Sequence, residues 1–119
     1  MTEKQMYPAL NRELGAQRSA LAPKPDAAFR AFNAAVFAEG ALSSKIKQLI
    51  AVASAHVTQC PYCIRGHTKA ALKAGATREE IMEAIWVAAE MRAGAAYAHS
   101  ALALDAMDEI SQRPVAEER

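Results

Sequence analysis

Residues 47–81 read KQLIAVASAHVTQCPYCIRGHTKAALKAGATREEI, and most of the helix signals of the chain lie in or beside this stretch. Pro61 lacks a backbone N–H and suits the first turn of a helix, so a helix is predicted over residues 61–74 with Cys60 as its N-cap. Residues 77–80, TREE, match the capping box that opens another helix. The cysteine pair is therefore expected at the start of a helix.

Further helices are predicted on both sides of this stretch. Ser43 or Ser44 can cap a helix that runs to about Gln59. Its apolar side chains at core spacing are Ile46, Leu49, Ile50, Ala53 and Val57. Residues 78 to about 109 predict one long helix, with a kink expected near Gly94.

The N-terminal third predicts two more helices, at about residues 4–20 and 25–38. A Pro23-Lys24-Pro25 break separates them, and Glu39-Gly40 ends the second. No run of β-branched and aromatic residues alternates with polar ones, so no strand is expected. The predicted fold is a single all-α domain over residues 1–119.

The composition favours a domain that assembles with copies of itself. Hydrophobic residues make up 52% of the 119 residues, whereas aromatic residues make up only 6%. A chain of this length buries about two-thirds of its unfolded surface, but helices rich in Ala each bury little apolar area. Apolar stripes are then left facing water, and a homo-oligomer is expected.

Charge and hydropathy exclude two classes of partner. The net charge is +1, and acidic and basic residues are read as interspersed along the chain, so no nucleic-acid partner is expected. Apolar stretches are broken before the ~18 residues that a membrane span needs, and Met1–Leu10 has no signal-peptide core. A cytoplasmic protein with no membrane partner is expected. In a reducing compartment, two cysteines so close together indicate catalysis or metal binding.

Cys60, Cys63 and His67 form the candidate redox site. Unpaired N–H groups and the helix dipole favour a thiolate at the N-cap and in the first turn. Three residues apart on one turn, the cysteines have Cα atoms roughly 5 to 6 Å apart, which a disulfide tolerates. His67 lies one turn beyond Cys63 and can take its proton. The spacing predicts a pair that cycles between dithiol and disulfide.

Two other interpretations of these residues are simpler than a redox site. Free cysteines are often small buried hydrophobes, but C-x-x-C with an internal proline and a histidine at i+4 rarely arises by accident. His56, Cys60, Cys63 and His67 could also ligate zinc. On a continuous helix these four residues span ~16 Å, too far for ligands about 2.0 to 2.3 Å from one ion, so no metal is predicted. His56 is expected to be partly buried or at an interface.

The quoted stretch resembles the core motif of the carboxymuconolactone decarboxylase superfamily, specifically its alkylhydroperoxidase D-like (AhpD-like) branch. The resemblance runs from about Tyr7 to Ile110, with the core motif at about residues 43–110. The branch motif is a Glu, a C-x-x-C twelve residues later and a His four residues beyond the second Cys. Cys60, Cys63 and His67 match this motif, whereas its Glu position falls on Gln48.

The resemblance implies an AhpD-like helical fold assembled as a homotrimer or homohexamer. It also implies a dithiol that reduces peroxides or exchanges disulfides without a bound cofactor. An external dithiol donor, for example of the lipoyl type, would regenerate it. Decarboxylation is not expected, because the decarboxylases of the superfamily lack the cysteine pair.

Gln48 cannot exchange a proton as a carboxylate does, so another residue is needed to complete a relay. Glu90, in an otherwise apolar segment, is the leading candidate, with an ordinary ion pair as the alternative. His99 has a weaker case. Trp86, Tyr97 and the methionines are expected in the core or at interfaces.

Three functional hypotheses follow. The favoured one is a thiol-dependent peroxidase or disulfide reductase, with Cys63 as peroxidatic thiolate, Cys60 as resolving thiol and His67 as base. The tetrapeptide Cys60-Pro61-Tyr62-Cys63 also occurs in glutaredoxins, but that fold needs strands around the motif, so only general dithiol exchange is kept. The third is a non-catalytic redox switch or binding protein.

Overall fold

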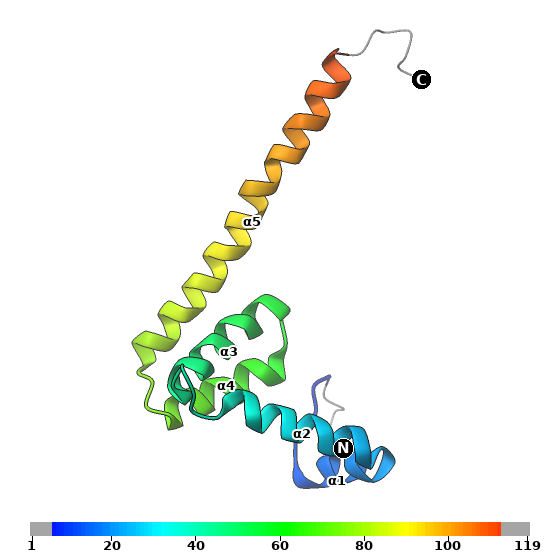
Figure 1. Ribbon diagram of the computed structural model, residues 1–119, viewed down its shortest axis with the longest axis vertical. Coiled ribbons are helices and arrows are strands. Elements are labelled where there is room, and N and C mark those ends of the chain that lie inside the picture. The colour runs from blue at the N-terminus through cyan, green and yellow to red at the C-terminus, as the bar shows by residue number, and fades with distance from the viewer. Residues whose placement is uncertain (1–5, 113–119) are drawn as a thin grey trace.

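Five α-helices and no strand make up residues 6–112, the part of the chain that the computed structural model describes. The helices are α1 (Arg12–Leu21), α2 (Pro23–Phe37), α3 (Ser44–Thr58), α4 (Pro61–Lys73) and α5 (Arg78–Gln112). The all-α prediction is therefore confirmed. Figure 1 shows α3 and α4 as an antiparallel hairpin, with α1 and α2 on one side and α5 projecting from the other.

The ends of α3, α4 and α5 agree with the capping signals of the sequence. Ser43 Oγ accepts the N–H of Ile46 at 3.2 Å to begin α3, and Cys60 is the N-cap of α4. Thr77 and Glu80 exchange hydrogen bonds of 2.8 and 3.0 Å, which completes the capping box before α5. Local side-chain chemistry therefore determines where these helices begin.

The N-terminal helices differ from their predicted bounds. The first helix begins at Arg12 rather than near residue 4, because the Asn11 side chain accepts the N–H of Leu14 and caps it there. Residues 4 and 5 of the predicted helix lie outside the described residues. Pro23 and Pro25 do not form a break between helices, since both lie in the first turn of α2.

The core lies where α3, α4 and the beginning of α5 meet. Its buried residues are Val52, Ala71, Ala76 and Ile81, with Leu49 and Ile85 packed against them. The predicted core face of α3 is partly wrong: Ile46, Ile50 and Val57 are exposed, whereas Val52 and Ala55 are buried. The apolar residues of α3 surround the helix, so periodicity alone did not identify the side that packs.

Beyond Gly94, α5 packs against none of the other described helices. The helix is continuous from Arg78 to Gln112, so it is not interrupted at Gly94, where a kink was expected (Figure 1). Residues 95–112 are all exposed. Tyr97 is 84% exposed and Leu102 is 67% exposed. Of the helices within residues 6–112, none has an apolar stretch long enough to cross a bilayer.

Candidate dithiol site

The turn between α3 and α4 places both cysteines at the beginning of a helix. Gln59 ends α3 in the left-handed region, with φ of 58°, and the chain reverses at Cys60. Pro61 then occupies the first turn of α4. Both thiols are free and half-buried, so the site holds a reduced pair that solvent reaches.

A thiol caps α4. The backbone N–H of Cys63 donates to Cys60 Sγ at 3.2 Å, as a serine hydroxyl would accept at an N-cap. The Cys63 thiol, by donating to Cys60, lowers the pKa of Cys60, and the same backbone N–H lowers it further. The hydrogen bond to Cys60 raises the pKa of Cys63, and burial adds to the rise.

The first proton of the pair is therefore lost more readily from Cys60. This order differs from the expectation of a thiolate at Cys63. The difference arises because Cys63 gives its N–H and its thiol hydrogen to Cys60 and receives no comparable donor in return. Deprotonation of Cys63 consequently requires a separate proton acceptor.

His67 is held in place by α2 and α3. Its Nδ1 donates to Oε1 of Gln48 at 2.8 Å. The ring of Phe37 stacks on the imidazole, with centroids 5.1 Å apart and planes at 27°. Because an amide oxygen only accepts, this contact places the imidazole proton on Nδ1 and leaves the Nε2 lone pair available.

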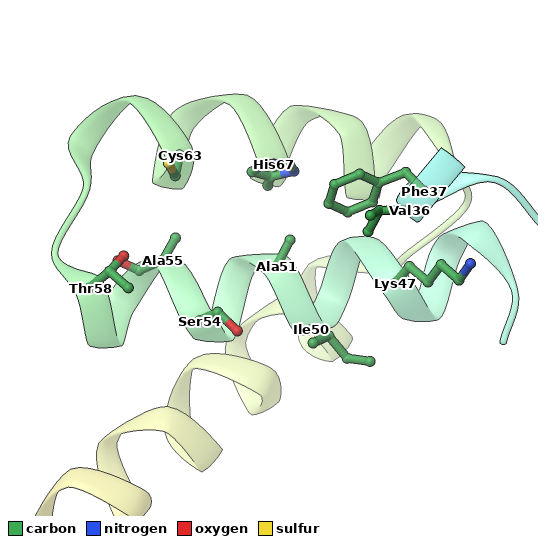
Figure 2. A pocket seen from close by; sticks show the side chains of 10 residues that line it. All are labelled: Val36, Phe37, Lys47, Ile50, Ala51, Ser54, Ala55, Thr58, Cys63 and His67. Atoms are coloured by element: carbon green, nitrogen blue, oxygen red, sulfur yellow. The ribbon is translucent and has the colours of Figure 1, made fainter. Parts of the chain in front are cut away.

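Cys63 and His67 both line two cavities. The first, here called the thiol groove, has a volume of about 420 Å³. Figure 2 shows its lining side chains, which come from α2, α3 and α4: Val36, Phe37, Lys47, Ile50, Ala51, Ser54, Ala55, Thr58, Cys63 and His67. The lining is mainly apolar, and Cys60 is not part of it.

The second cavity, here called the rear cleft, has a volume of about 440 Å³. Leu10, Asn33 and Gln48 join Phe37, Cys63 and His67 in its lining, which Tyr62, Gly66 and Ala70 complete. A small molecule in either cavity can therefore reach Cys63, whereas Cys60, the N-cap of α4, lines neither cavity.

Other predicted site residues lie elsewhere. Glu90 is exposed on α5, contributes to neither cavity and packs beside Gly94, so it is not brought to the thiols within this chain. His99 is also exposed on α5, where Nδ1 donates to Ala95 O at 2.7 Å. His56 Nδ1 donates to Val52 O at 2.7 Å in its own helix. Within residues 6–112, no three His, Cys, Asp or Glu side chains gather as a metal-binding group.

Sequence reasoning missed Phe37 and the contacts of Tyr62. The Tyr62 hydroxyl donates to Pro8 O at 2.7 Å, and the Tyr7 and Tyr62 rings meet edge to face at 5.8 Å. No local pattern identifies Phe37, because its partner lies on another helix. For Tyr62, the only sign of a role at the site in the sequence was its position between the two cysteines.

The fold and this site define an all-helical dithiol protein. The model of the carboxymuconolactone decarboxylase family matches residues 23–106, and the chain belongs to that family. A Paracoccus denitrificans protein named "Uncharacterized protein 4 in cox locus" is 68% identical over 85 residues, which cover 71% of this chain and 77% of that protein. An uncharacterized protein of Cupriavidus necator is 40% identical over 96 residues, covering 79% and 84%.

Two crystal structures are similar in both fold and sequence. A carboxymuconolactone decarboxylase family protein from Legionella pneumophila is 37% identical, with a TM-score of 0.63, and the match covers 82% of this chain and 87% of that one. A protein from Methanobacterium thermoautotrophicum is 38% identical, with a TM-score of 0.66, covering 70% and 93%. The AhpD-like resemblance is consistent with this membership.

Proposed function

We propose that the protein is a thiol-dependent peroxidase or disulfide reductase that uses the Cys60–Cys63 dithiol. The observation that carries the proposal is that Cys63 and His67 line the same cavities while Cys60 is hydrogen-bonded behind Cys63. The attacking thiol of Cys63 thus has a second thiol about one helical turn before it and a proton acceptor about one turn after it.

In the proposed peroxide reaction, His67 Nε2 takes the proton of Cys63. The thiolate attacks the distal peroxide oxygen, the O–O bond breaks, and a Cys63 sulfenic acid and an alkoxide form. The alkoxide takes the proton held by His67 and leaves as an alcohol. Cys60 then attacks the sulfenic sulfur, which closes the disulfide and releases water.

An external dithiol returns the site to its reduced form. One donor thiolate attacks Cys63, the cysteine that faces the cavities, and Cys60 leaves as a thiolate. The N–H of Cys63 and the start of α4 stabilise that leaving group, because a thiol of lowered pKa leaves faster. The second donor thiol then displaces Cys63, so the donor disulfide is released. No bound cofactor is required in this cycle.

We also propose the compartment, the electron donor, the assembly and the substrate class that fit this reaction. A reducing, cytoplasmic compartment supplies dithiol donors, of which a lipoyl-type dithiol is one class. The apolar, unpartnered part of α5 supports assembly as a homotrimer or homohexamer. The thiol groove, with its apolar lining, suits an organic peroxide better than a charged one.

Steady-state consumption of an organic hydroperoxide with dihydrolipoamide, compared with thioredoxin as donor, tests the proposal. Turnover that is lost in Cys63→Ser and in His67→Ala, with both variants folded, is the expected result. A disulfide that forms and is reduced without peroxide or disulfide turnover would contradict an enzyme and favour a redox switch.

A further inference from the structure

The thiol groove differs chemically between its two ends. Six of its lining residues share one face of α3, because they are spaced at i, i+3, i+4, i+7, i+8 and i+11: Lys47, Ile50, Ala51, Ser54, Ala55 and Thr58. This face covers about 16 Å of helix. Figure 2 shows Lys47 at one end of it and Thr58 at the other, with Cys63 on α4 toward the Thr58 end. The groove therefore leads from a cation to a thiol.

The section of the groove between these ends is apolar. Val36 and Phe37 of α2 join Ile50 and Ala51 of α3 in its lining. Val36 is 41% exposed and Ile50 is 50% exposed, so the other described residues leave much of both side chains uncovered. A hydrocarbon chain laid in the groove would remove this apolar surface from water, which favours binding.

Lys47 supplies the positive charge at its end of the groove. Its Nζ donates to Ala38 O at 2.6 Å, which holds the ammonium beside the C-cap of α2. Within residues 6–112, the ion pairs involve other basic side chains, so no carboxylate there neutralises Lys47. An ammonium has three N–H donors, and two of them are left for an anion.

No acidic residue opposes this cation from the two helices of the hairpin. Residues 40–77 contain five Lys or Arg residues and no Asp or Glu, although the whole chain has 14 basic and 13 acidic residues. This corrects the expectation that charges are interspersed. Glu39, which follows Phe37 by two residues, is exposed and forms no ion pair among the described residues. The Lys47 end of the groove therefore favours an anion.

The distance between the cation and the dithiol sets the length of a matching ligand. The backbone N–H of Cys60 donates to Ala55 O at 3.2 Å, so Ala55 marks the level of the dithiol on α3. Ala55 lies eight residues beyond Lys47, which is about 12 Å along the helix. An extended chain covers about 3.4 Å with every three bonds, so about ten bonds span this distance. The groove volume of about 420 Å³ is within the range of ligand pockets.

We propose that Lys47 determines substrate specificity by pairing with the carboxylate of a fatty-acid hydroperoxide, whose O–O group lies about ten bonds away at Cys63. The proposal rests on the proposed function and names a substrate class for it. The negative charge of such a substrate is at the end remote from the peroxide, so the apolar section still receives an uncharged chain.

The bond changes are those of the proposed cycle, and Lys47 takes no part in them. The distal oxygen passes to the Cys63 sulfur, the O–O bond breaks, and the alkoxide takes the proton held by His67 and leaves as a hydroxy acid. Cys60 then closes the disulfide and releases water. The dithiol supplies both electrons.

The experiment compares one hydroperoxide with and without its negative charge. The substrates are linoleic acid hydroperoxide and its methyl ester, both below their critical micelle concentrations. The readout is the single-turnover rate constant for oxidation of the reduced dithiol, which needs no electron donor. Lys47→Gln is the test variant and Lys47→Arg retains the charge. Lys73→Gln, at an exposed position of α4 outside the thiol groove, is the matched control for net charge.

We expect Lys47→Gln to lose about five-fold with the acid and less than about two-fold with the methyl ester, because only the acid pairs with the ammonium. Lys47→Arg and Lys73→Gln should behave as wild type with both substrates. Added salt should reduce the advantage of the acid over the ester in the wild-type protein. Equal losses with both substrates in Lys47→Gln, or the same loss in Lys73→Gln, would overturn the proposal.

Two further measurements separate this proposal from its alternatives. A change in sedimentation of Lys47→Gln would overturn it, because the groove would then be a contact between copies of this chain. If neither hydroperoxide oxidises the wild-type dithiol, the peroxidase function fails. Calorimetric titration with linoleic acid and methyl linoleate then still tests recognition by Lys47. Tighter binding of the acid than of the ester, lost in Lys47→Gln, would support it, and equal binding would overturn it.

Discussion

The amide oxygen of Gln48 on α3 lies 2.8 Å from Nδ1 of His67 on α4. Among the described residues, this is the one side-chain hydrogen bond that orients the imidazole ring. An amide oxygen orients the ring as a carboxylate would, but it carries no charge that stabilises an imidazolium. The site therefore has a positioned proton acceptor whose charged form is not supported by a neighbouring anion.

Gln48→Glu is expected to raise the rate at which Cys63 is alkylated at neutral pH. The introduced carboxylate would stabilise the imidazolium that forms when His67 takes the thiol proton, with an effect of about ten-fold. Gln48→Leu, which has no acceptor, should lower the rate. Stopped-flow alkylation in a Cys60→Ser background checks both, and equal rates in the two variants would remove Gln48 from the mechanism.

Glu90→Gln is expected to leave the alkylation rate of Cys63 almost unchanged. The carboxylate is exposed and contributes to neither cavity within this chain. A loss of ~10² in a folded variant, the size typical of removing a general acid or base, would instead show that Glu90 reaches a thiol site across a subunit contact. Peroxide turnover and sedimentation on the same sample distinguish these outcomes.

The pH dependence of Cys60 should follow its hydrogen-bond donors. The donor contacts of Cys63 lower the pKa of Cys60, so Cys60 remains a thiolate at pH values where an ordinary cysteine is protonated. In Cys63→Ser a hydroxyl still donates, and half-maximal alkylation of Cys60 should stay at low pH. In Cys63→Ala only the backbone N–H remains, and the midpoint should rise. Identical midpoints would contradict the assigned cause.

Cys60 and Cys63 should form a reversible intramolecular disulfide under mild oxidation. Their positions at the N-cap and N3 of α4 place the thiols in hydrogen-bond contact. Thiol titration should fall from two free thiols to none and recover with a dithiol. Two thiols that survive the oxidant, or a stoichiometric zinc that protects them, would contradict this prediction.

A charge on the projecting part of α5 should weaken self-association. Residues 95–112 of α5 are all exposed, so the apolar side chains there are not covered by any part of residues 6–112. Ala95→Glu or Ala98→Glu should shift sedimentation toward smaller species, whereas Ala20→Glu on α1 should not. A folded wild-type monomer at micromolar concentration would exclude a stable assembly.

The sequence predicted helix starts, which depend on hydrogen bonds between neighbouring residues. It did not predict most side-chain contacts between different helices. Ser43, Cys60 and Thr77 each mark a helix start through a local hydrogen bond, so their effect is visible in order along the chain. The bond from His67 to Gln48 and the stacking of Phe37 join separate helices and have no local pattern. Family resemblance pointed to Gln48, but nothing in the sequence pointed to Phe37.

The expectation for Glu90 failed within this chain for a related reason. An apolar neighbourhood in sequence suggested burial, but α5 projects from the core (Figure 1), and Glu90 is exposed. The first helix was predicted too long because the cap at Asn11 competes with an otherwise helical composition. The Glu90 difference shows that tertiary arrangement decides burial when apolar residues surround a helix, whereas the late start of the first helix results from a local cap.

In the proposed reaction, the capping atom of α4 is also one of the two reacting sulfur atoms. Cys60 Sγ accepts the Cys63 N–H in the reduced protein, and a sulfur bonded in a disulfide is a poorer acceptor than a thiolate. Reduction is therefore favoured by the same interaction that begins the helix. A dithiol whose reduced form is stabilised has a higher reduction potential, so in the proposed cycle the N-cap would make the Cys60–Cys63 pair a stronger oxidant than an unconstrained pair of the same spacing.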